Sequence, residues 1–265
     1  MPQGDPPQAD RPAPGSAFAF VAIGDFGTGG EDQYEVAERM CEWHDEFPFE
    51  IVITTGDNVY PVGQPESFDA ALYEPYGCLI ENDVRFHASL GNHDVMTDNG
   101  FHELNEPFLG MGEERNYIVR RGGVRFVIAD SNSLDLDWLR GNLTAGKGDR
   151  WTVVAFHHPV LSPGSSHGST PGFLARLAPL FSERGVDLVL NGHDHIYAAT
   201  REVRGVRYVV TGGGGAPLYG CEELDVAEEC IAEHHFLYVS VERERLTVTA
   251  VGVDGESLHS FEIAD

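Results

Sequence analysis

Five short apolar segments of this chain stop at side chains that can bind metal ions, and no other feature constrains the fold as strongly. The segments are FAFVAI, EIVITT, VRFHASL, WTVVAF and VDLVL, followed by GDFG, GDNVY, GNHD, HHP and NGHDH. Short apolar runs rich in β-branched residues are typical of buried strands. Because the carboxyl ends of the strands in an open α/β sheet form one edge, we expect the five polar clusters to converge there.

Helical segments alternate with these strands and predict an α/β fold. Apolar residues recur at helical spacing in four segments, which are 31–47, 66–76, 134–143 and 170–185. Residues 116–130 and 197–211 instead predict antiparallel hairpins, and 236–263 predict a three-stranded meander. No repeat or linker divides the chain after residue 16, so we predict a disordered lead-in over 1–16 and a single domain over 17–265.

The charge balance excludes several classes of partner. Acidic residues number 43 against 17 basic ones, which gives a formal net charge of -26. Such a surface repels nucleic acid and anionic lipid, so we expect neither as a partner, and no obligate protein partner is evident. A phosphorylated substrate would also be repelled. A phosphate site in this chain therefore needs its own concentrated positive charge, which metal ions can supply.

In this order, the motifs GDFG, GDNVY, GNHD, VAFH and GHDH resemble those of the purple acid phosphatases, which belong to the calcineurin-like metallophosphoesterase superfamily. The resemblance runs from about Phe18 to the C-terminus and is strongest to the small tartrate-resistant type. It implies a four-layer α-β-β-α sandwich with mixed sheets and a dinuclear metal site at the carboxyl ends of the strands. It also implies hydrolysis of small phosphomonoesters at acidic to neutral pH, through attack by a metal-bridged hydroxide.

Carried over position by position, the resemblance implies seven metal ligands. They are Asp25, Asp57, Tyr60 and His195 for a first metal, and Asn92, His157 and His193 for a second, with Asp57 as the bridge. The first ion is expected to be Fe(III) and the second Fe(II), Zn(II) or Mn(II). Donor chemistry favours the same division, because carboxylate and phenolate oxygens suit a hard trivalent ion, whereas amide and imidazole groups suit divalent ions.

Cleavage of a phosphomonoester also needs a proton for the departing alkoxide. His93, next to the ligand Asn92, matches a histidine that the family places beside the metals, and we predict that it is the general acid. His167, ten residues after His157, is a second catalytic candidate, with an ordinary polar loop residue as the alternative. His158 has no assigned role. The glycine-rich stretch 211–217 is expected to form a flexible rim that faces the substrate.

Two rival functions stay open at this point. A phosphodiesterase or nucleotide hydrolase could use the same ligands, although the tyrosine at position 60 favours the purple phosphatases, since many phosphodiesterase relatives carry histidine there. A non-catalytic protein that binds metal or phosphate is the other alternative, and the presence of His93 argues against it. The natural substrate and the oligomeric state cannot be inferred from the sequence.

The four cysteines leave the compartment open. They are few for a disulfide scaffold and have no CxxC spacing for zinc or redox chemistry. Cys221 and Cys230 bracket an acidic loop and could close it as a disulfide if the protein is exported, but the sequence does not decide whether they do. The localisation is therefore unknown, with export to the periplasm or the cell exterior as one alternative, through a leader that this sequence does not include.

Overall fold

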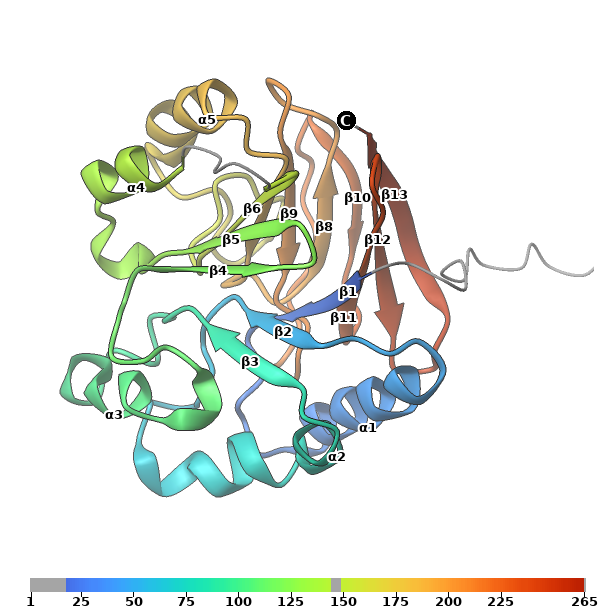
Figure 1. Cartoon of the computed structure of the whole chain (residues 1–265). Coiled ribbons are helices and arrows are strands. Elements are labelled where there is room, and N and C mark those ends of the chain that lie inside the picture. The colour runs from blue at the N-terminus through green and yellow to red at the C-terminus, as the bar shows by residue number, and fades with distance from the viewer. Residues whose placement is uncertain (1–17, 144–148, 265) are drawn as a thin grey trace, which may run out of the picture.

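Two mixed β-sheets face each other, with helices on both outer sides (Figure 1). The structure, a computed structural model, describes residues 18–143 and 149–264, so the lead-in expected over 1–16 lies outside the described residues. The strand orders are β13-β12-β11-β1-β2-β3 and β10-β8-β9-β7-β6-β5-β4. The chain thus forms an α/β sandwich with mixed sheets, as predicted.

The six-stranded sheet consists of β1 (Phe18–Ile23), β2 (Ile51–Thr54), β3 (Arg85–Ala88), β11 (His235–Val241), β12 (Arg245–Gly252) and β13 (Ser257–Ala264). The seven-stranded sheet consists of β4 (Tyr117–Arg121), β5 (Val124–Ile128), β6 (Trp151–Ala155), β7 (Leu188–Asn191), β8 (Tyr197–Thr200), β9 (Arg207–Thr211) and β10 (Ala227–Ile231). The α-helices are α1 (Glu31–Glu46), α2 (Gly77–Glu81), α3 (Phe101–Leu104), α4 (Leu136–Asn142) and α5 (Phe173–Glu183).

Three hydrophobic cores account for the four layers. One core lies between the two sheets and contains Phe20 and Phe126, whose rings meet edge to face with centroids 4.8 Å apart. A second core packs the six-stranded sheet against α1. The third packs the seven-stranded sheet against α4 and α5. Each sheet is therefore covered on both faces, which requires nearly continuous apolar strands such as those in the sequence.

Alternation along β1 shows how one strand serves two cores. Phe18, Phe20 and Ala22 belong to the core between the sheets, whereas Ala19, Val21 and Ile23 belong to the core under α1. Successive side chains of a strand point to opposite faces, so a strand buried on both faces must be apolar at every position. The helix α1 completes its core with Val36, Ala37, Met40 and Trp43, which recur at helical spacing on one buried face.

The carboxyl ends of two sets of parallel strands meet at one side of the sandwich. Strands β1, β2 and β3 are parallel in the first sheet, and β5, β6, β7 and β9 are parallel in the second. The sequence pattern alone suggested a single sheet edge. The structure instead brings together two edges, one from each sheet, and the five polar clusters follow β1, β2, β3, β6 and β7 there.

Some local elements differ from the sequence-based expectations. Residues 66–76 were expected to be helical, but they form a 3-10 turn (Pro65–Ser67) and one π-helical stretch (Asp69–Tyr73) instead of a regular α-helix. The strand β10 was not predicted, because its sequence AEECI is not a continuous apolar run. The two hairpins and the C-terminal meander formed as expected.

Both cysteine pairs are disulfide-bonded. Cys221–Cys230 closes the loop before β10, which settles an alternative that the sequence left open. Cys41–Cys78 joins α1 to α2, and no spacing in the sequence indicated that pair. In the described part of the chain, none of the helices is both long and apolar enough to span a bilayer.

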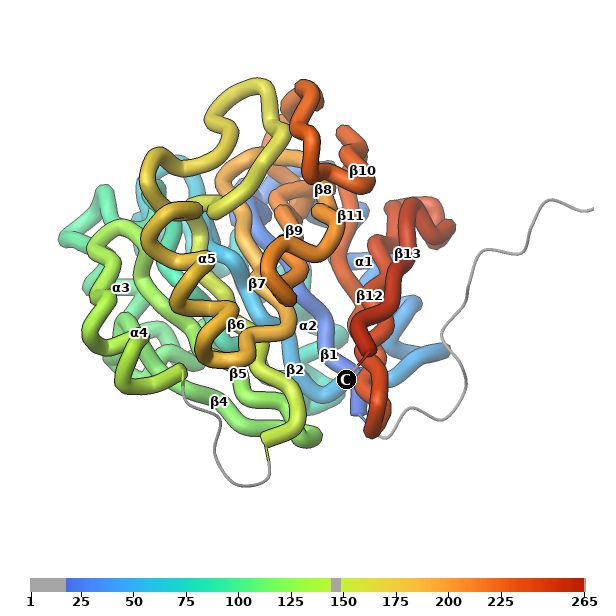
Figure 2. Tube along the Cα trace, turned by 90° about the horizontal axis from the view of Figure 1, so that it is seen from above, coloured from blue at the N-terminus to red at the C-terminus, as the bar shows by residue number. Residues whose placement is uncertain are grey.

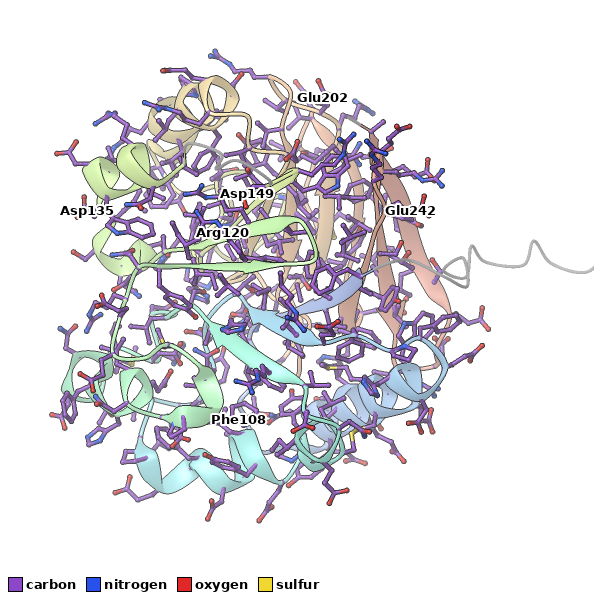
Figure 3. The ribbon with its side chains drawn as sticks, viewed as in Figure 1. Phe108, Arg120, Asp135, Asp149, Glu202 and Glu242 are labelled. Atoms are coloured by element: carbon purple, nitrogen blue, oxygen red, sulfur yellow. A yellow bond between two sulfur atoms is a disulfide. The ribbon has the colours of Figure 1, made fainter. Side chains whose placement is uncertain are left out.

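Acidic side chains are spread over the molecule. Asp135, Glu202 and Glu242 lie on different sides of it (Figure 3). The three residues belong to segments on different sides of the sandwich, whose helices α4 and α5 lie away from β12 and β13 when it is seen from above (Figure 2). Acidic side chains thus occur on several sides of the molecule.

Candidate metal centre

Three of the predicted ligands stand on unusual backbone. Asp25, Asp57 and His193 have φ angles of 56°, 52° and 71°, in the left-handed region that residues other than glycine seldom adopt. Each of the three follows a glycine in a tight turn just beyond a strand. Such strained residues cluster at functional sites, where the surrounding structure enforces them. The turns aim the three side chains at one another across the two sheets.

A first group of donor atoms gathers around Tyr60. Its hydroxyl oxygen lies 3.0 Å from Asp57 Oδ2, 3.4 Å from Asp25 Oδ1 and 3.2 Å from His195 Nε2. His195 Nε2 is itself 3.4 Å from Asp25 Oδ1. The other ring nitrogen of His195 donates to the carbonyl of Pro217 at 2.7 Å, which leaves Nε2 to face the group.

A second group gathers around His157. Its Nε2 lies 3.0 Å from Asn92 Oδ1, 3.1 Å from His193 Nδ1 and 3.5 Å from Asp57 Oδ2. His157 Nδ1 donates to the carbonyl of Thr55 at 2.9 Å, so the ring orientation is fixed in the same way as that of His195. Asp57 Oδ2 is thus shared by both groups, and this one oxygen links the two sets of predicted ligands.

The second group fits a bound cation and would be repulsive without one. Burial lowers the pKa of His157 well below its usual range, so the ring is neutral, and its proton is on Nδ1. Nε2 therefore presents a lone pair to Asn92 Oδ1 and Asp57 Oδ2, which are also acceptors. Burial and the neighbouring imidazoles lower the pKa of His193 to about 2, so this ring is neutral as well. Atoms of Asp25, Asp57 and His157 lie within 4.8 Å of one another, a spacing that suits metal ligation.

The first group crowds two carboxyls and a phenol together, with His195 as the basic side chain among them. Burial raises the pKa of Asp25 to about 7, although hydrogen bonding and the charge of His195 oppose the shift. Burial, together with Asp25 and Asp57, raises the pKa of the Tyr60 phenol far above its usual range. Burial lowers the pKa of His195, but the contact with Asp25 outweighs it and the net shift is upward. Burial thus favours the protonated forms of Asp25 and Tyr60, and a cation beside them would be needed to stabilise their anionic forms.

The two predicted catalytic histidines lie at the rim of these groups. His93 Nδ1 donates to the carbonyl of Pro61 at 2.6 Å, which turns Nε2 toward Asp57 Oδ2 at 4.0 Å. Its side chain is 32% exposed, so a ligand in the site can reach it. The ring of His167 stacks on that of His193 with centroids 4.0 Å apart. The structure thus brings all nine predicted site residues together, while their roles stay predictions.

Several residues outside the nine predicted site residues support this site. His158 contacts the His193 ring at 4.6 Å, and Ser131 holds it through both the backbone nitrogen and Nδ1. Behind the second group, Asp94 accepts hydrogen bonds from the backbone nitrogens of Asn58 at 2.8 Å and Gly91 at 2.7 Å. Asp94 and His158 stand in the clusters GNHD and HHP, but the sequence does not show their supporting roles, because these depend on packing.

The glycine-rich stretch does not form a flexible rim as expected. Residues 211–216 are buried, and Gly214 N donates to the carbonyl of Gly24 while Ala216 N donates to that of Asp25. The stretch therefore supports the turn that carries Asp25 from behind. Only the following segment, from Pro217 onward, reaches the surface beside the site.

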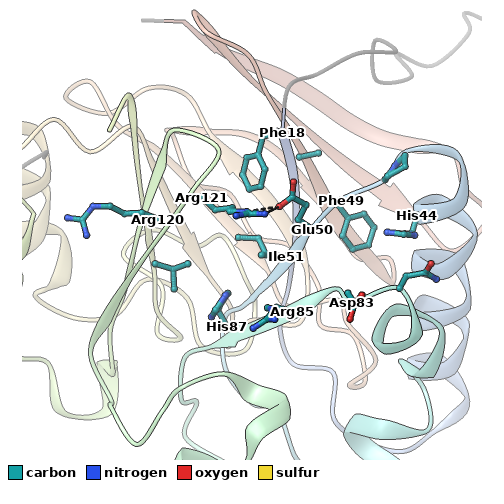
Figure 4. Close-up of a pocket in the computed structure, with 14 residues that line it drawn as sticks. Phe18, His44, Phe49, Glu50, Ile51, Asp83, Arg85, His87, Arg120 and Arg121 are labelled. Atoms are coloured by element: carbon teal, nitrogen blue, oxygen red, sulfur yellow. Dashed lines mark hydrogen bonds and ion pairs between the residues drawn. The ribbon is translucent and has the colours of Figure 1, made fainter. Parts of the chain in front are cut away.

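A hollow of about 790 Å³ lies at the opposite ends of the strands (Figure 4). Its lining includes Phe18, Ile51 and Arg85, the first residues of β1, β2 and β3, together with Arg121 of β4. None of the nine predicted site residues lines it. The chemistry of the donor groups, rather than the size of a hollow, thus locates the candidate active site.

Comparison with known proteins agrees with this geometry. The family model described as calcineurin-like phosphoesterase matches residues 18–197. Purple acid phosphatase 4 of Arabidopsis thaliana is 26% identical over 95% of this chain and 85% of its own length. Tartrate-resistant acid phosphatase type 5 of Oryctolagus cuniculus is 31% identical over 90% of this chain and 88% of its own. The purple acid phosphatase PPD1 from yellow lupin (Lupinus luteus) seeds shares the fold, with a TM-score of 0.79 and 16% identity, over 97% of this chain and 55% of that one.

Proposed function

This chain belongs to the calcineurin-like phosphoesterase family and is a metal-dependent phosphatase, and we propose that it hydrolyses small phosphomonoesters at acidic to neutral pH with two metal ions. The observation that carries the proposal is the position of Asp57 Oδ2. This oxygen lies 3.0 Å from Tyr60 Oη in the first group and 3.5 Å from His157 Nε2 in the second. A carboxylate shared in this way can bridge two ions.

The first group would hold Fe(III). It combines the carboxylates of Asp25 and Asp57 with the Tyr60 phenol and one imidazole, a set rich in hard anionic oxygens. Because burial raises the pKa of Tyr60, its proton leaves only beside a strongly charged cation. The second group, with Asn92, His157 and His193, has mostly neutral donors and would hold Fe(II), Zn(II) or Mn(II).

The substrate phosphate would depend on these ions for charge compensation. No arginine or lysine in the described residues forms a hydrogen bond or ion pair with any of the seven predicted ligands. Bound metal ions would supply Lewis acidity and lower the pKa of the attacking water. The chain itself holds the ligand groups rigidly, because His157 and His195 are each tied to a backbone carbonyl.

We assign to His93 the transfer of a proton to the leaving group. Its Nδ1 is fixed by the carbonyl of Pro61, so Nε2 is the nitrogen available to the site. Tyr60 packs against the same ring with centroids 4.6 Å apart and limits its movement. We also assign an active-site role to His167, which borders the second group through its stack on His193.

The test combines metal content, colour and substrate preference. A phenolate bound to Fe(III) absorbs visible light, so iron-loaded protein is expected to be pink to violet and Tyr60→Phe to lose the band. Tyr34→Phe, which alters an exposed tyrosine of α1, is the matched control and should keep the colour. Iron content is measured on the same samples.

Hydrolysis of aryl and alkyl monoesters is compared with that of diesters in the same preparations. Turnover of diesters alone would replace the proposal by the phosphodiesterase alternative. Iron-replete wild type without a visible band under oxidising conditions would remove Tyr60 from the metal site. Metal binding without any hydrolysis would favour a non-catalytic protein.

A further inference from the structure

A surface segment after the glycine-rich stretch makes three contacts with the predicted ligand His195. In this segment, residues 217–222, the carbonyl of Pro217 accepts from His195 Nδ1 at 2.7 Å. The backbone nitrogen of Tyr219 donates to the carbonyl of His195 at 3.0 Å. The Tyr219 ring lies flat on the His195 ring, with centroids 4.1 Å apart and planes inclined by 12°. Both the tautomer and the tilt of the imidazole are therefore set by this segment.

The same segment is paired to the loop that carries His167. Gly220 and Ser165 exchange two hydrogen bonds, from Ser165 N to Gly220 O at 2.9 Å and from Gly220 N to Ser165 Oγ at 3.1 Å. Gly164 and Cys221 form a β-bridge next to them. On its other side, the 163–168 loop is held by Asp194, whose carboxylate accepts from the backbone nitrogen of His167 at 3.0 Å.

Tyr219 stands between the two histidines that these contacts hold. Its ring meets that of His167 edge to face with centroids 5.6 Å apart, and His167 stacks in turn on His193 at 4.0 Å. The rings of His195, Tyr219, His167 and His193 thus form one continuous series of contacts. Removal of the Tyr219 ring would therefore change the packing of His195 directly and that of His193 through His167, and these are predicted ligands of the first and the second metal.

A covalent bond closes the framework. Cys221, at the end of the segment, is bonded to Cys230 of β10. Cys230 pairs with Ala198 of β8, which lies three residues after His195 in the chain. The path from His195 through β8, β10 and the disulfide back to Tyr219 is therefore a closed ring of chain, hydrogen bonds and one S–S bond.

We propose that residues 217–222 act as a clamp that orients His195 and His167. Tyr219 is the positioning residue of this clamp, and the Cys221–Cys230 disulfide holds the clamp to β10. The inference rests on His195 being a metal ligand, as in the proposed function, and names what holds it. Tyr219 touches neighbouring rings, so its effect on metal and turnover is indirect. Partners that orient a metal ligand typically change metal affinity or activity by about 10- to 100-fold when removed.

The first experiment compares Tyr219→Leu, which removes the ring, with Tyr219→Phe, which keeps it. Tyr34→Leu is the control, because Tyr34 is an exposed residue of α1. Protein loaded with Fe(III) and Zn(II) is diluted into excess chelator, and each retained metal is measured with time. Tyr219→Leu is expected to release the first metal at least about tenfold faster and to lower kcat more than KM. Tyr219→Phe should restore retention, and the control should match wild type.

The second experiment uses the two disulfides as a matched pair. Both span the same Cα–Cα distance of 6.1 Å. Replacing Cys221 and Cys230 together by serine is expected to speed metal release, whereas replacing Cys41 and Cys78 should not. Both double variants should lower Tm, because a cross-link constrains the unfolded chain. Equal rates of metal release from the two double variants would show that Cys221–Cys230 contributes only general stability, and would overturn its role in holding the clamp.

A readout without metal separates this inference from the proposed function. In metal-free protein, the ring protons of His195 and His167 are followed by NMR. Tyr219→Leu should broaden their resonances, because the imidazoles are no longer held in one orientation; a shift alone also follows from loss of the Tyr219 ring current and decides nothing. Resonances as sharp as those of wild type together with unchanged metal release would refute the clamp. If wild type hydrolyses no monoester but Tyr219→Leu still broadens these resonances, the proposed function fails and the clamp stands.

Discussion

Acid is expected to destabilise this protein partly through His235, a residue outside the metal site. Its side chain is fully buried at the start of β11. Nδ1 donates to the carbonyl of Glu233 at 2.9 Å, and Nε2 accepts from Thr211 Oγ1 at 3.1 Å. Both ring nitrogens are thus used by the neutral form. Burial accordingly lowers the pKa of His235 to about 4, from an ordinary value of 6.5.

The sign and size of the effect follow from this shift. Because the folded-state pKa lies below the unfolded one, the unfolded chain takes up the proton first. Stability contributed by the neutral ring is therefore complete above about pH 6.5 and is lost as the pH falls toward 4. A shift of 2.5 units corresponds to roughly 3 kcal/mol in the limit, and to about 2.5 kcal/mol between pH 7.5 and 4.5.

The measurement is urea unfolding of metal-free protein at both pH values, for wild type and His235→Gln. Buried carboxyls such as Asp25 also titrate, but they are common to the two proteins and cancel in the difference between them. Wild type should lose about 2.5 kcal/mol more than the variant on acidification. His44→Gln, in the last turn of α1, serves as the control and should follow wild type. An equal loss in wild type and His235→Gln would refute the reasoning.

Three further predictions concern the site itself. Asn92→Ala and His157→Ala are each expected to weaken binding of the second metal and to cut turnover by several orders of magnitude, while the circular dichroism spectrum stays unchanged. Near-normal hydrolysis by either variant would rule out that residue as a ligand. His93→Ala should retain both metals and lose about 100-fold in kcat for alkyl esters but less for aryl esters, whose leaving groups need little protonation; equal losses would argue against the acid role. Gly91→Ala would place a methyl carbon 2.0 Å from Asp57 Oδ1, so metal analysis should show both ions depleted, and full occupancy would contradict the close packing.

Much of the fold could be predicted because the strands are apolar on both faces. Runs such as those of β1 and β2 contribute to two cores at once, so they are apolar at every position and can be recognised as buried strands even in a single sequence. The partition into two sheets was expected only from the family resemblance, since an apolar run does not record which strand it pairs with. The strand β10 carries acidic residues and owes its place to pairing with β8 and to the Cys221–Cys230 bond.

The candidate site shows the same division. The predicted ligands follow strands directly, so strand ends and side-chain chemistry together point to them. Tyr219 follows no strand and belongs to no motif, and its contact with His195 arises from the path of a loop. Glu103 also belongs to no sequence motif, although it is fully buried beside Asn58 and Asp94. Burial raises its pKa well above the usual range, a property that depends on the folded surroundings alone.

The position of β1 has a consequence for the order of events during synthesis. This strand is the first of the described chain, yet one of its two neighbours is β11, near the other end. Until β11 has left the ribosome, β1 has an open edge that can pair with another chain. Asp25, which follows β1, must likewise wait for His195 and Pro217 before its surroundings exist. Contacts so distant in sequence form slowly, so the surroundings of Asp25 are complete only after nearly the whole polypeptide has been synthesised.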